Sequence, residues 1–175
     1  MSDVYEPRED SLILEKYVKK FARGNVLDMG TGSGIQARAA AEKATTVVAV
    51  DINQDAIEAC KKDSGKIIFL RSDLFSALEG KIFDTIIFNA PYLPDDDSYK
   101  DVALDGGKNG YEMIERFLRG AKRFLARDGL ILLVFSSFTN KARVDALIRM
   151  NGFKFTELEK VHVMFEDIYC YKINL

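Results

Sequence analysis

The sequence has no tryptophan, one histidine, two cysteines and three prolines among its 175 residues. Cys60, Cys170 and His162 are too few for a dense disulfide framework or for a zinc site with four cysteine and histidine ligands. We therefore expect two buried free thiols in a reducing cytoplasm and no metal site. His162 lies between two valines in a strand-like segment, a position that does not favour a catalytic role.

Long apolar segments and a strong excess of one charge are also absent. The longest apolar run, Leu130 to Phe135, is far shorter than the roughly 18 residues that a membrane-spanning helix needs. Residues 1–7 lack the basic and apolar regions of a signal peptide. The formal net charge is −2, which does not favour a strongly basic nucleic-acid-binding module but is compatible with a local basic patch.

What is present is the composition of an ordinary globular domain. Hydrophobic residues make up 47% of the chain and charged residues 30%, values that fit a folded protein rather than a disordered one. No repeat, low-complexity tract or proline-rich linker interrupts the sequence. We therefore expect one domain over residues 1–175.

Helical and strand-like patterns alternate along the chain. We predict helices over 8–22, 35–43, 53–62, 111–125 and 141–150, and strands over 25–29, 46–50, 67–70, 83–88, 130–135, 153–163 and 168–173. Asn53 is the expected N-cap of its helix, and a turn at Glu166 and Asp167 separates the last two strands. Apolar strands alternating with helices predict an α/β fold with a doubly wound, mostly parallel seven-stranded sheet, closed by an antiparallel C-terminal hairpin.

Candidate functional residues follow the carboxyl ends of the strands, where ligands bind in open α/β sheets. The first strand contains Asp28 and leads into Gly30, Gly32 and Gly34 ahead of a helix. Glycine permits a tight turn and close approach of the backbone to a ligand. A dinucleotide-binding fingerprint would need glycine in place of Ile35, and no P-loop lysine follows. The Asp28 carboxylate would repel a pyrophosphate and attract an ammonium group; an ordinary tight turn is the alternative.

The next two strands are also followed by acidic residues. Asp51 lies 21 residues after Gly30, a spacing that suits a carboxylate holding ribose hydroxyls, although a cap of the following helix is the alternative. Asp73 precedes Leu74, so its carboxylate can accept a hydrogen bond from the exocyclic amine of adenine while the ring packs on the leucine. Asp73 alone is weak evidence for adenine binding. The evidence is stronger because Asp73 is the third acidic residue in succession at a strand end.

The fourth strand is followed by the tetrapeptide NAPY at residues 89–92, and here the sequence resembles a known family. The tetrapeptide is similar to the Asn/Asp-Pro-Pro-Tyr/Phe motif of class I S-adenosylmethionine-dependent methyltransferases that act on amino groups. Residues 3–11, DVYEPREDS, resemble the amino-terminal signature of HemK-type protein-glutamine methyltransferases, in their short archaeal and eukaryotic branch. Residues 106–110 resemble a glycine loop of that branch, so the resemblance covers nearly the whole chain.

The resemblance implies a Rossmann-like methyltransferase fold that binds S-adenosylmethionine, with the helix in residues 1–22 covering the cofactor site. The cofactor-binding residues that it implies are Ser11, Asp28, Gly30, Gly32, Gly34, Asp51, Asp73, Leu74 and Asn89. The catalytic positions that it implies are Asn89, Ala90, Pro91 and Tyr92. Ala90 stands where proline is usual, so the motif loses rigidity but keeps its backbone carbonyl.

The chemistry of methyl transfer fits these residue types. The methyl group of a sulfonium is already activated, so neither a metal nor a covalent nucleophile is required. A glutamine nitrogen is a poor nucleophile because its lone pair is delocalised into the carbonyl. The resemblance implies that the Asn89 oxygen and a backbone carbonyl of the motif accept the two N–H hydrogens, with Tyr92 against the planar amide. Such positioning can supply about 7–11 kcal/mol of the barrier.

The resemblance also implies a substrate and a partner. The substrate is a class I translation release factor, methylated on the glutamine of its Gly-Gly-Gln motif. The partner is a small zinc-binding activator protein that adds a strand to a sheet edge at Ile67–Leu70. The segment 93–108 holds five aspartates and two lysines, a balance that suits a basic protein substrate rather than a phosphate backbone; a solvated flexible loop is the alternative.

Other functions stay open at this point. An adenine-N6 or other nucleic-acid amino-methyltransferase uses the same type of motif, although such enzymes generally need a recognition domain or a basic groove. A non-catalytic scaffold that binds the cofactor and supports a partner is compatible with Ala90. A protein lysine is another methyl acceptor that the motif allows.

Overall fold

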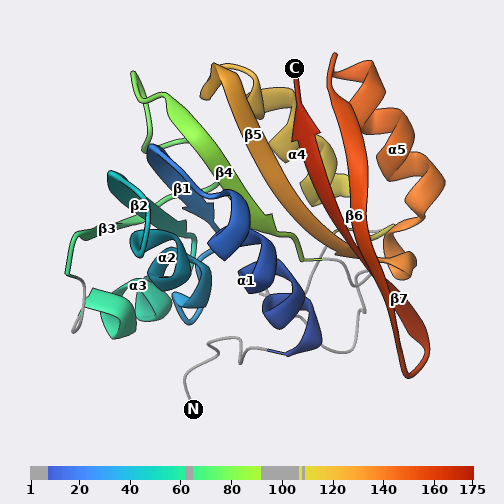
Figure 1. The fold of residues 1–175 in the computed structure, drawn as a ribbon, viewed down its shortest axis with the longest axis horizontal. Helices are drawn as coiled ribbons and strands as arrows, with labels where there is room; N and C mark the ends of the chain where they lie inside the picture. Colours follow the sequence, from blue (N-terminus) through green and yellow to red (C-terminus); the bar gives the residue numbers. More distant parts are fainter. Residues whose placement is uncertain (1–7, 62–64, 92–106, 108) are drawn as a thin grey trace.

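The computed structural model describes residues 8–61, 65–91, 107 and 109–175, and it contains a seven-stranded sheet with helices on both faces (Figure 1). The helices are α1 (Glu9–Phe21), α2 (Ile35–Ala41), α3 (Gln54–Lys61), α4 (Glu112–Ala121) and α5 (Lys141–Met150), with a short 3-10 helix η1 (Ser137–Thr139). The strands are β1 (Asn25–Met29), β2 (Thr46–Asp51), β3 (Ile67–Arg71), β4 (Phe83–Asn89), β5 (Leu125–Ser136), β6 (Lys154–Val163) and β7 (Glu166–Asn174).

The strand order is β3-β2-β1-β4-β5-β7-β6. Strands β1 to β5 run parallel, and β7 lies antiparallel to both β5 and β6. The predicted doubly wound sheet with an antiparallel closing hairpin is confirmed, and β3 lies at the sheet edge as expected. The order reverses between β1 and β4, which creates the switch point at which such sheets bind ligands.

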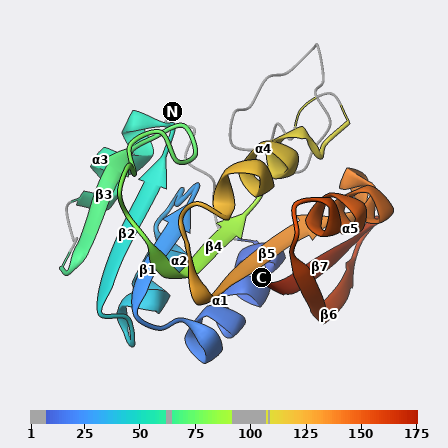
Figure 2. The ribbon, with the colours of Figure 1, turned by 90° about the horizontal axis from the view of Figure 1, so that it is seen from above.

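Two apolar layers hold the helices on the sheet. On one face α1, α2 and α3 pack on the strands, and on the other face α4 and α5 do so. Figure 2 shows α1 and α4 on opposite sides of the sheet. Because successive strand residues point to opposite faces, Val26 joins the first layer and Leu27 the second. Burial on both sides explains why these strands are apolar along their whole length.

The boundary between α4 and β5 differs from the sequence prediction. The helix predicted over 111–125 ends at Ala121, and β5 begins at Leu125 instead of Leu130. The Phe83 N–H donates to the Phe124 carbonyl at 2.8 Å, and Leu125 then pairs with Phe83. Pairing with the start of β4 therefore extends β5 back to Leu125, with a shift of register before Leu130, and local periodicity does not reveal this contact.

The turn of the closing hairpin lies at Met164–Phe165, so its predicted position at Glu166 and Asp167 is wrong. Glu166 pairs with Val163 in the ladder, and its carboxylate accepts a hydrogen bond from the Ser136 hydroxyl. The two acidic residues therefore belong to β7 and to its attachment to β5. Polar residues are usual in turns, which is why the turn was predicted at these two residues, whereas an apolar pair occupies it.

The remaining sequence predictions concern thiols and membranes. Cys60 and Cys170 are both buried free thiols, as predicted. Burial raises the pKa of Cys170 to about 12, so this thiol stays protonated. Within the described ranges, no cluster of His, Cys, Asp and Glu could hold a metal ion. The helices of the described part are all too short or too polar to cross a membrane.

Candidate functional site

The predicted site residues gather at one edge of the sheet. Asp28, Asp51 and Asn89 occupy the last or second-last positions of the neighbouring parallel strands β1, β2 and β4. Asp73 follows β3, the next strand outward. Helix α1 crosses to the same edge, where Ser11 in its first turn approaches Asn89. The structure therefore brings together residues that are up to 78 positions apart in the chain.

The loop after β1 makes a tight turn into α2. Gly30, Gly32 and Gly34 have φ angles of +65°, +50° and +78°, which side chains rarely adopt. Space is also limited at Gly34, where an added Cβ would lie 3.0 Å from both the Cys60 Sγ and the Arg38 Nη1. This position thus requires glycine for its dihedral angle and for its close packing.

Asp28 lies beneath this glycine loop and is 1% exposed. Its Oδ2 accepts a hydrogen bond from the Thr31 Oγ1 at 2.6 Å. Burial raises the pKa of Asp28 to about 7, and hydrogen bonds from Thr31 and from the Ala37 backbone oppose the rise. The contacts that the structure gives to this carboxyl are thus with the loop and with the first turn of α2, which it holds together.

Asp51 connects the ends of β1 and β2. Its Oδ2 accepts from the Gly32 N–H at 2.8 Å, and its Oδ1 accepts from the Asn53 N–H at 2.9 Å. The predicted cap is confirmed, because the Asn53 Oδ1 accepts from the Asp55 N–H at 2.9 Å. Because Asn53 caps α3, Asp51 is not needed as the cap. The partly exposed Asp51 carboxylate instead orients the glycine loop through its hydrogen bond with Gly32.

Asp73 and Leu74 lie in a turn after β3. The Ser72 hydroxyl donates to the Leu74 carbonyl at 2.7 Å and accepts from the Ala77 N–H at 3.0 Å, which fixes the turn. The Asp73 carboxylate receives the Arg116 guanidinium of α4 at 2.9 and 3.1 Å, with both side chains about half exposed. The ion pair is not predictable from the sequence, and an adenine amine at Asp73 would have to share the carboxylate with Arg116.

The Asn89 side chain is held by the first turn of α1. Its Nδ2 donates to the Asp10 Oδ2 at 2.9 Å and lies 3.4 Å from the Ser11 Oγ. A carboxylate only accepts hydrogen bonds, so Asp10 determines which way the Asn89 amide faces. The Asn89 Oδ1 is buried and has no hydrogen-bond partner among the described residues. Leaving such an acceptor unpaired costs about 1–3 kcal/mol, so a bound molecule that donates a hydrogen bond to Oδ1 would recover this free energy.

Asp10 is a residue of this candidate site that was not predicted from the sequence. Its carboxyl is 3% exposed, and its Oδ1 accepts from the Ser11 N–H at 2.7 Å. Gln36 of α2, also 3% exposed, reinforces the arrangement by donating from its Nε2 to the Ser11 carbonyl at 2.8 Å. The sequence signal was ambiguous, because an acidic residue in the first turn of a helix is favourable for the helix dipole alone.

The residues after Asn89 continue toward β5. Ala90 is 2% exposed, and its N–H donates to the Val134 carbonyl at 3.2 Å. Proline has no N–H, so alanine gains here a hydrogen bond that restrains the motif in place of the proline ring. Pro91 is partly exposed, whereas Tyr92, the segment 93–106 and the signature residues 3–7 lie outside the described residues.

Comparison with known proteins adds sequence relatives to this geometry. Residues 9–162 match the family described as methyltransferase small domain. A putative protein N5-glutamine methyltransferase of Methanocaldococcus jannaschii is 37% identical over 95% of this chain and 89% of its own length. A release factor glutamine methyltransferase of Thermodesulfovibrio yellowstonii is 29% identical over 88% of this chain. The match spans only 63% of the length of that relative.

Solved structures share the fold. A chain of the E. cuniculi Mtq2–Trm112 complex, described as responsible for methylation of the eRF1 translation termination factor, is 27% identical with a TM-score of 0.84. The match covers 99% of both chains. The ribosomal protein L11 methylase of Lactobacillus delbrueckii has a TM-score of 0.71 over 97% of this chain and 81% of its own. At 18% identity the second likeness concerns the fold alone.

Proposed function

Because the chain belongs to the methyltransferase small domain family, we propose that it transfers a methyl group from S-adenosylmethionine to the side-chain amide nitrogen of a glutamine. The substrate in this proposal is the Gly-Gly-Gln motif of a class I translation release factor in the cytoplasm. The names of the M. jannaschii and T. yellowstonii relatives support the glutamine, and the E. cuniculi complex supports a translation termination factor.

The described residues fit S-adenosylmethionine. Acidic side chains at three strand ends suit a nucleoside that carries a sulfonium cation; these are Asp28, Asp51 and Asp73. In the proposal Asp51 holds the ribose, Asp73 the adenine amine and Leu74 the adenine ring. Gly30, Gly32 and Gly34 let the backbone approach the ligand, with Ser11 and Asn89 at the other side. When bound, the cofactor supplies an activated methyl group.

The buried, unpaired Asn89 Oδ1 is the observation that supports a side-chain amide as the group that receives the methyl. A primary amide has two N–H groups, and an acceptor for one of them aims the nitrogen lone pair. In the proposal Asp10 keeps the Asn89 Oδ1 turned toward the substrate amide, because the Asp10 Oδ2 accepts from the Asn89 Nδ2 at 2.9 Å. In the proposal the Ala90 carbonyl takes the second N–H, and Pro91 and Tyr92 complete the motif. Alignment of this kind accounts for about 7–11 kcal/mol in well-oriented reactions.

A small activator protein is part of the proposal. Strand β3 lies at the edge of the sheet, and Ile68 on it is 51% exposed. An apolar edge strand favours pairing with a strand of another chain. The E. cuniculi structure contains Trm112 beside Mtq2, which supports a partner of this type. That the partner binds zinc is inferred from the family resemblance alone.

Transfer of a labelled methyl group tests the proposal. Wild-type protein with S-adenosylmethionine and a release factor is expected to label the Gly-Gly-Gln glutamine. We expect Asn89→Ala to lower kcat by about 10²-fold, because the acceptor that aims the nitrogen is lost. The matched control is Asn174→Ala, which is expected to keep wild-type activity. Asn174 is an exposed asparagine at the end of β7, on the side of the sheet where the parallel strands begin.

The same assay separates the other functions. Label in RNA or DNA would favour a nucleic-acid methyltransferase, and label on lysine would replace the glutamine as the acceptor. Binding of S-adenosylhomocysteine without transfer to any of these, even with the activator protein present, would favour a scaffold. Each of these three results contradicts the proposal.

A further inference from the structure

We propose that the turn of the closing hairpin, Met164 and Phe165, is a docking arm for the protein that carries the acceptor glutamine. The inference rests on the proposed function and adds a substrate-binding surface to it. Met164 is 80% exposed and Phe165 is 87% exposed, more than any other large hydrophobic residue in the described part of the chain. Figure 1 shows the hairpin of β6 and β7 projecting beyond the neighbouring elements.

The fold itself does not explain these two residues. They form a two-residue loop between the paired residues Val163 and Glu166. Met164 has a φ of +49°, and glycine is the favoured residue where the first loop position has positive φ. Polar residues are usual in such turns, whereas Met164 and Phe165 expose apolar surface to water. Residues that suit neither the turn nor the solvent point to a contact with another molecule.

The base of the hairpin is firmly attached to the sheet. The Glu166 carboxylate accepts a hydrogen bond from the Ser136 hydroxyl, and the Asp167 N–H donates to the Ser137 Oγ at 3.0 Å. The Asp167 carboxylate also pairs with the Lys160 Nζ at 2.8 Å and with the His162 Nδ1 at 3.0 Å. The apolar pair is therefore presented from a braced support, which reduces the entropy lost when a partner binds.

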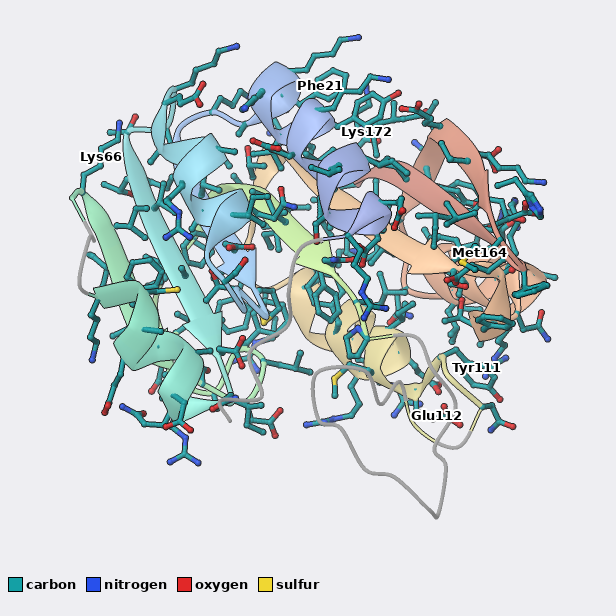
Figure 3. All side chains as sticks on the ribbon, turned by 90° about the horizontal axis from the view of Figure 1, so that it is seen from below. Phe21, Lys66, Tyr111, Glu112, Met164 and Lys172 are labelled. Atoms are coloured by element: carbon teal, nitrogen blue, oxygen red, sulfur yellow. The ribbon has the colours of Figure 1, made fainter. Side chains whose placement is uncertain are left out.

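The position of the hairpin indicates which partner it contacts. Its base joins Ser136, the last residue of β5, and the Val134 carbonyl two residues earlier accepts from the Ala90 N–H beside Asn89. The turn thus lies at the same edge of the sheet as Asn89, and Met164 is labelled in Figure 3. Strand β3 lies at the other end of the strand order, so an activator paired there is remote from the turn.

A second apolar side chain supports a protein partner. Phe138 of η1 is 46% exposed and adjoins the hairpin base, where its N–H donates to the Ser136 Oγ at 3.2 Å. A protein that delivers a glutamine to Asn89 can therefore bury Phe138 together with Met164 and Phe165. A short peptide around the glutamine would reach Asn89 without contacting the hairpin turn.

The double variant Met164→Gly/Phe165→Ser tests the docking arm. We expect the KM for an intact release factor to rise about tenfold or more through loss of apolar contact, with kcat little changed. The KM for a short Gly-Gly-Gln peptide should not change. The melting temperature should not fall, because glycine suits the positive φ at the first position. Met150→Ser is the matched control, since Met150 is 74% exposed at the far end of α5.

The outcomes distinguish the docking arm from the proposed function. An unchanged KM for the release factor in the double variant, with an active wild type, would overturn the docking arm alone. Equal losses on peptide and protein would also overturn it, because the turn would then act on the site itself. A wild type that methylates neither substrate would overturn the proposed function and the docking arm with it. Phe165→Ser alone repeats the measurement should the double variant fold poorly.

Discussion

At the scale of single residues, the site depends on the orientation of one amide. Asn89 can face two ways, and the two orientations present opposite hydrogen-bonding groups. Asp10 removes this ambiguity because its carboxylate accepts from the Asn89 Nδ2. In the proposed function Asp10 does not touch the substrate, so we propose that it is a positioning residue.

Replacement of Asp10 by asparagine tests this role. The substituted amide would offer both a donor and an acceptor, so Asn89 would no longer have a single preferred orientation. We expect Asp10→Asn to lower kcat by roughly 10- to 100-fold while the affinity for S-adenosylhomocysteine changes little. Asp55→Asn, an exposed aspartate in the first turn of α3, is the matched control. Equal loss of cofactor affinity and kcat would indicate a merely structural role for Asp10.

A second residue-scale prediction concerns pH. Burial raises the pKa of Asp28 to about 7 from its ordinary value of 3.8. The folded protein therefore binds this proton more tightly, so the contribution of Asp28 to stability is complete below pH 3.8 and is lost as pH rises through about 7. We expect the melting temperature of the wild type to fall as pH rises through about 7, and that of Asp28→Asn to fall less.

The pH measurement needs one control. His162 is the single histidine of the chain, and histidine is the residue type that ordinarily titrates near neutral pH. His162→Gln should retain the wild-type pH dependence, since Asp28 remains in place. Identical pH dependence in the wild type and in Asp28→Asn would contradict a raised pKa at Asp28.

At the scale of elements, the loop between β1 and α2 combines backbone and packing demands. Gly34→Ala is expected to destabilise the protein by more than the roughly 1–2 kcal/mol of left-handed strain, because its Cβ would crowd Cys60 and Arg38. Gly80→Ala is the matched control, with a φ of +74° and nothing within 4 Å of an added Cβ. Chemical denaturation measures both. Equal losses in the two variants would show that crowding at Gly34 is unimportant.

The elements differ in how well their sequences predicted them. Helix α5 was predicted over 141–150 and is found there, because Asn151 and Gly152 end it locally: the Asn151 N–H donates to the Leu147 carbonyl, and Gly152 has a φ of +80°. The end of α4 was not predicted, because it follows from tertiary contacts: the Phe83 N–H of β4 donates to the Phe124 carbonyl, and the Phe124 ring stacks on Phe75 at 4.6 Å between ring centroids. Local signals determine an end of the first kind, and tertiary contacts determine one of the second.

At the scale of the whole molecule, the sheet separates two proposed interfaces. The activator would pair with β3 at one end of the strand order, and the release factor would contact the β6–β7 turn toward the other. The site with Asn89 lies between them, on the central strand β4. Both partners can therefore bind at the same time without competing for a surface.

Charge on β3 should prevent strand pairing with an activator without affecting the fold. Ile68→Lys replaces a side chain that is 51% exposed, and we expect the chain to lose its affinity for the activator while its melting temperature is retained. Ile82→Lys is the matched control, because Ile82 is 52% exposed and precedes β4 rather than lying on the edge strand. Pull-down and calorimetry measure the affinity. Undiminished binding by Ile68→Lys would place the activator elsewhere.

The sequence by itself determined the order and type of the elements and the residues that follow each parallel strand. Hydrophobic periodicity and glycine turns act over a few neighbouring residues, so Asp51 and Asn89 could be assigned to strand ends directly. Only the tertiary structure decided that Asp10 holds Asn89 across 79 positions, that Arg116 pairs with Asp73, and that an apolar turn closes the hairpin. The first two features depend on how helices pack on the sheet, since residues far apart in the chain meet only when the core has formed. The third depends on the register in which β6 pairs with β7.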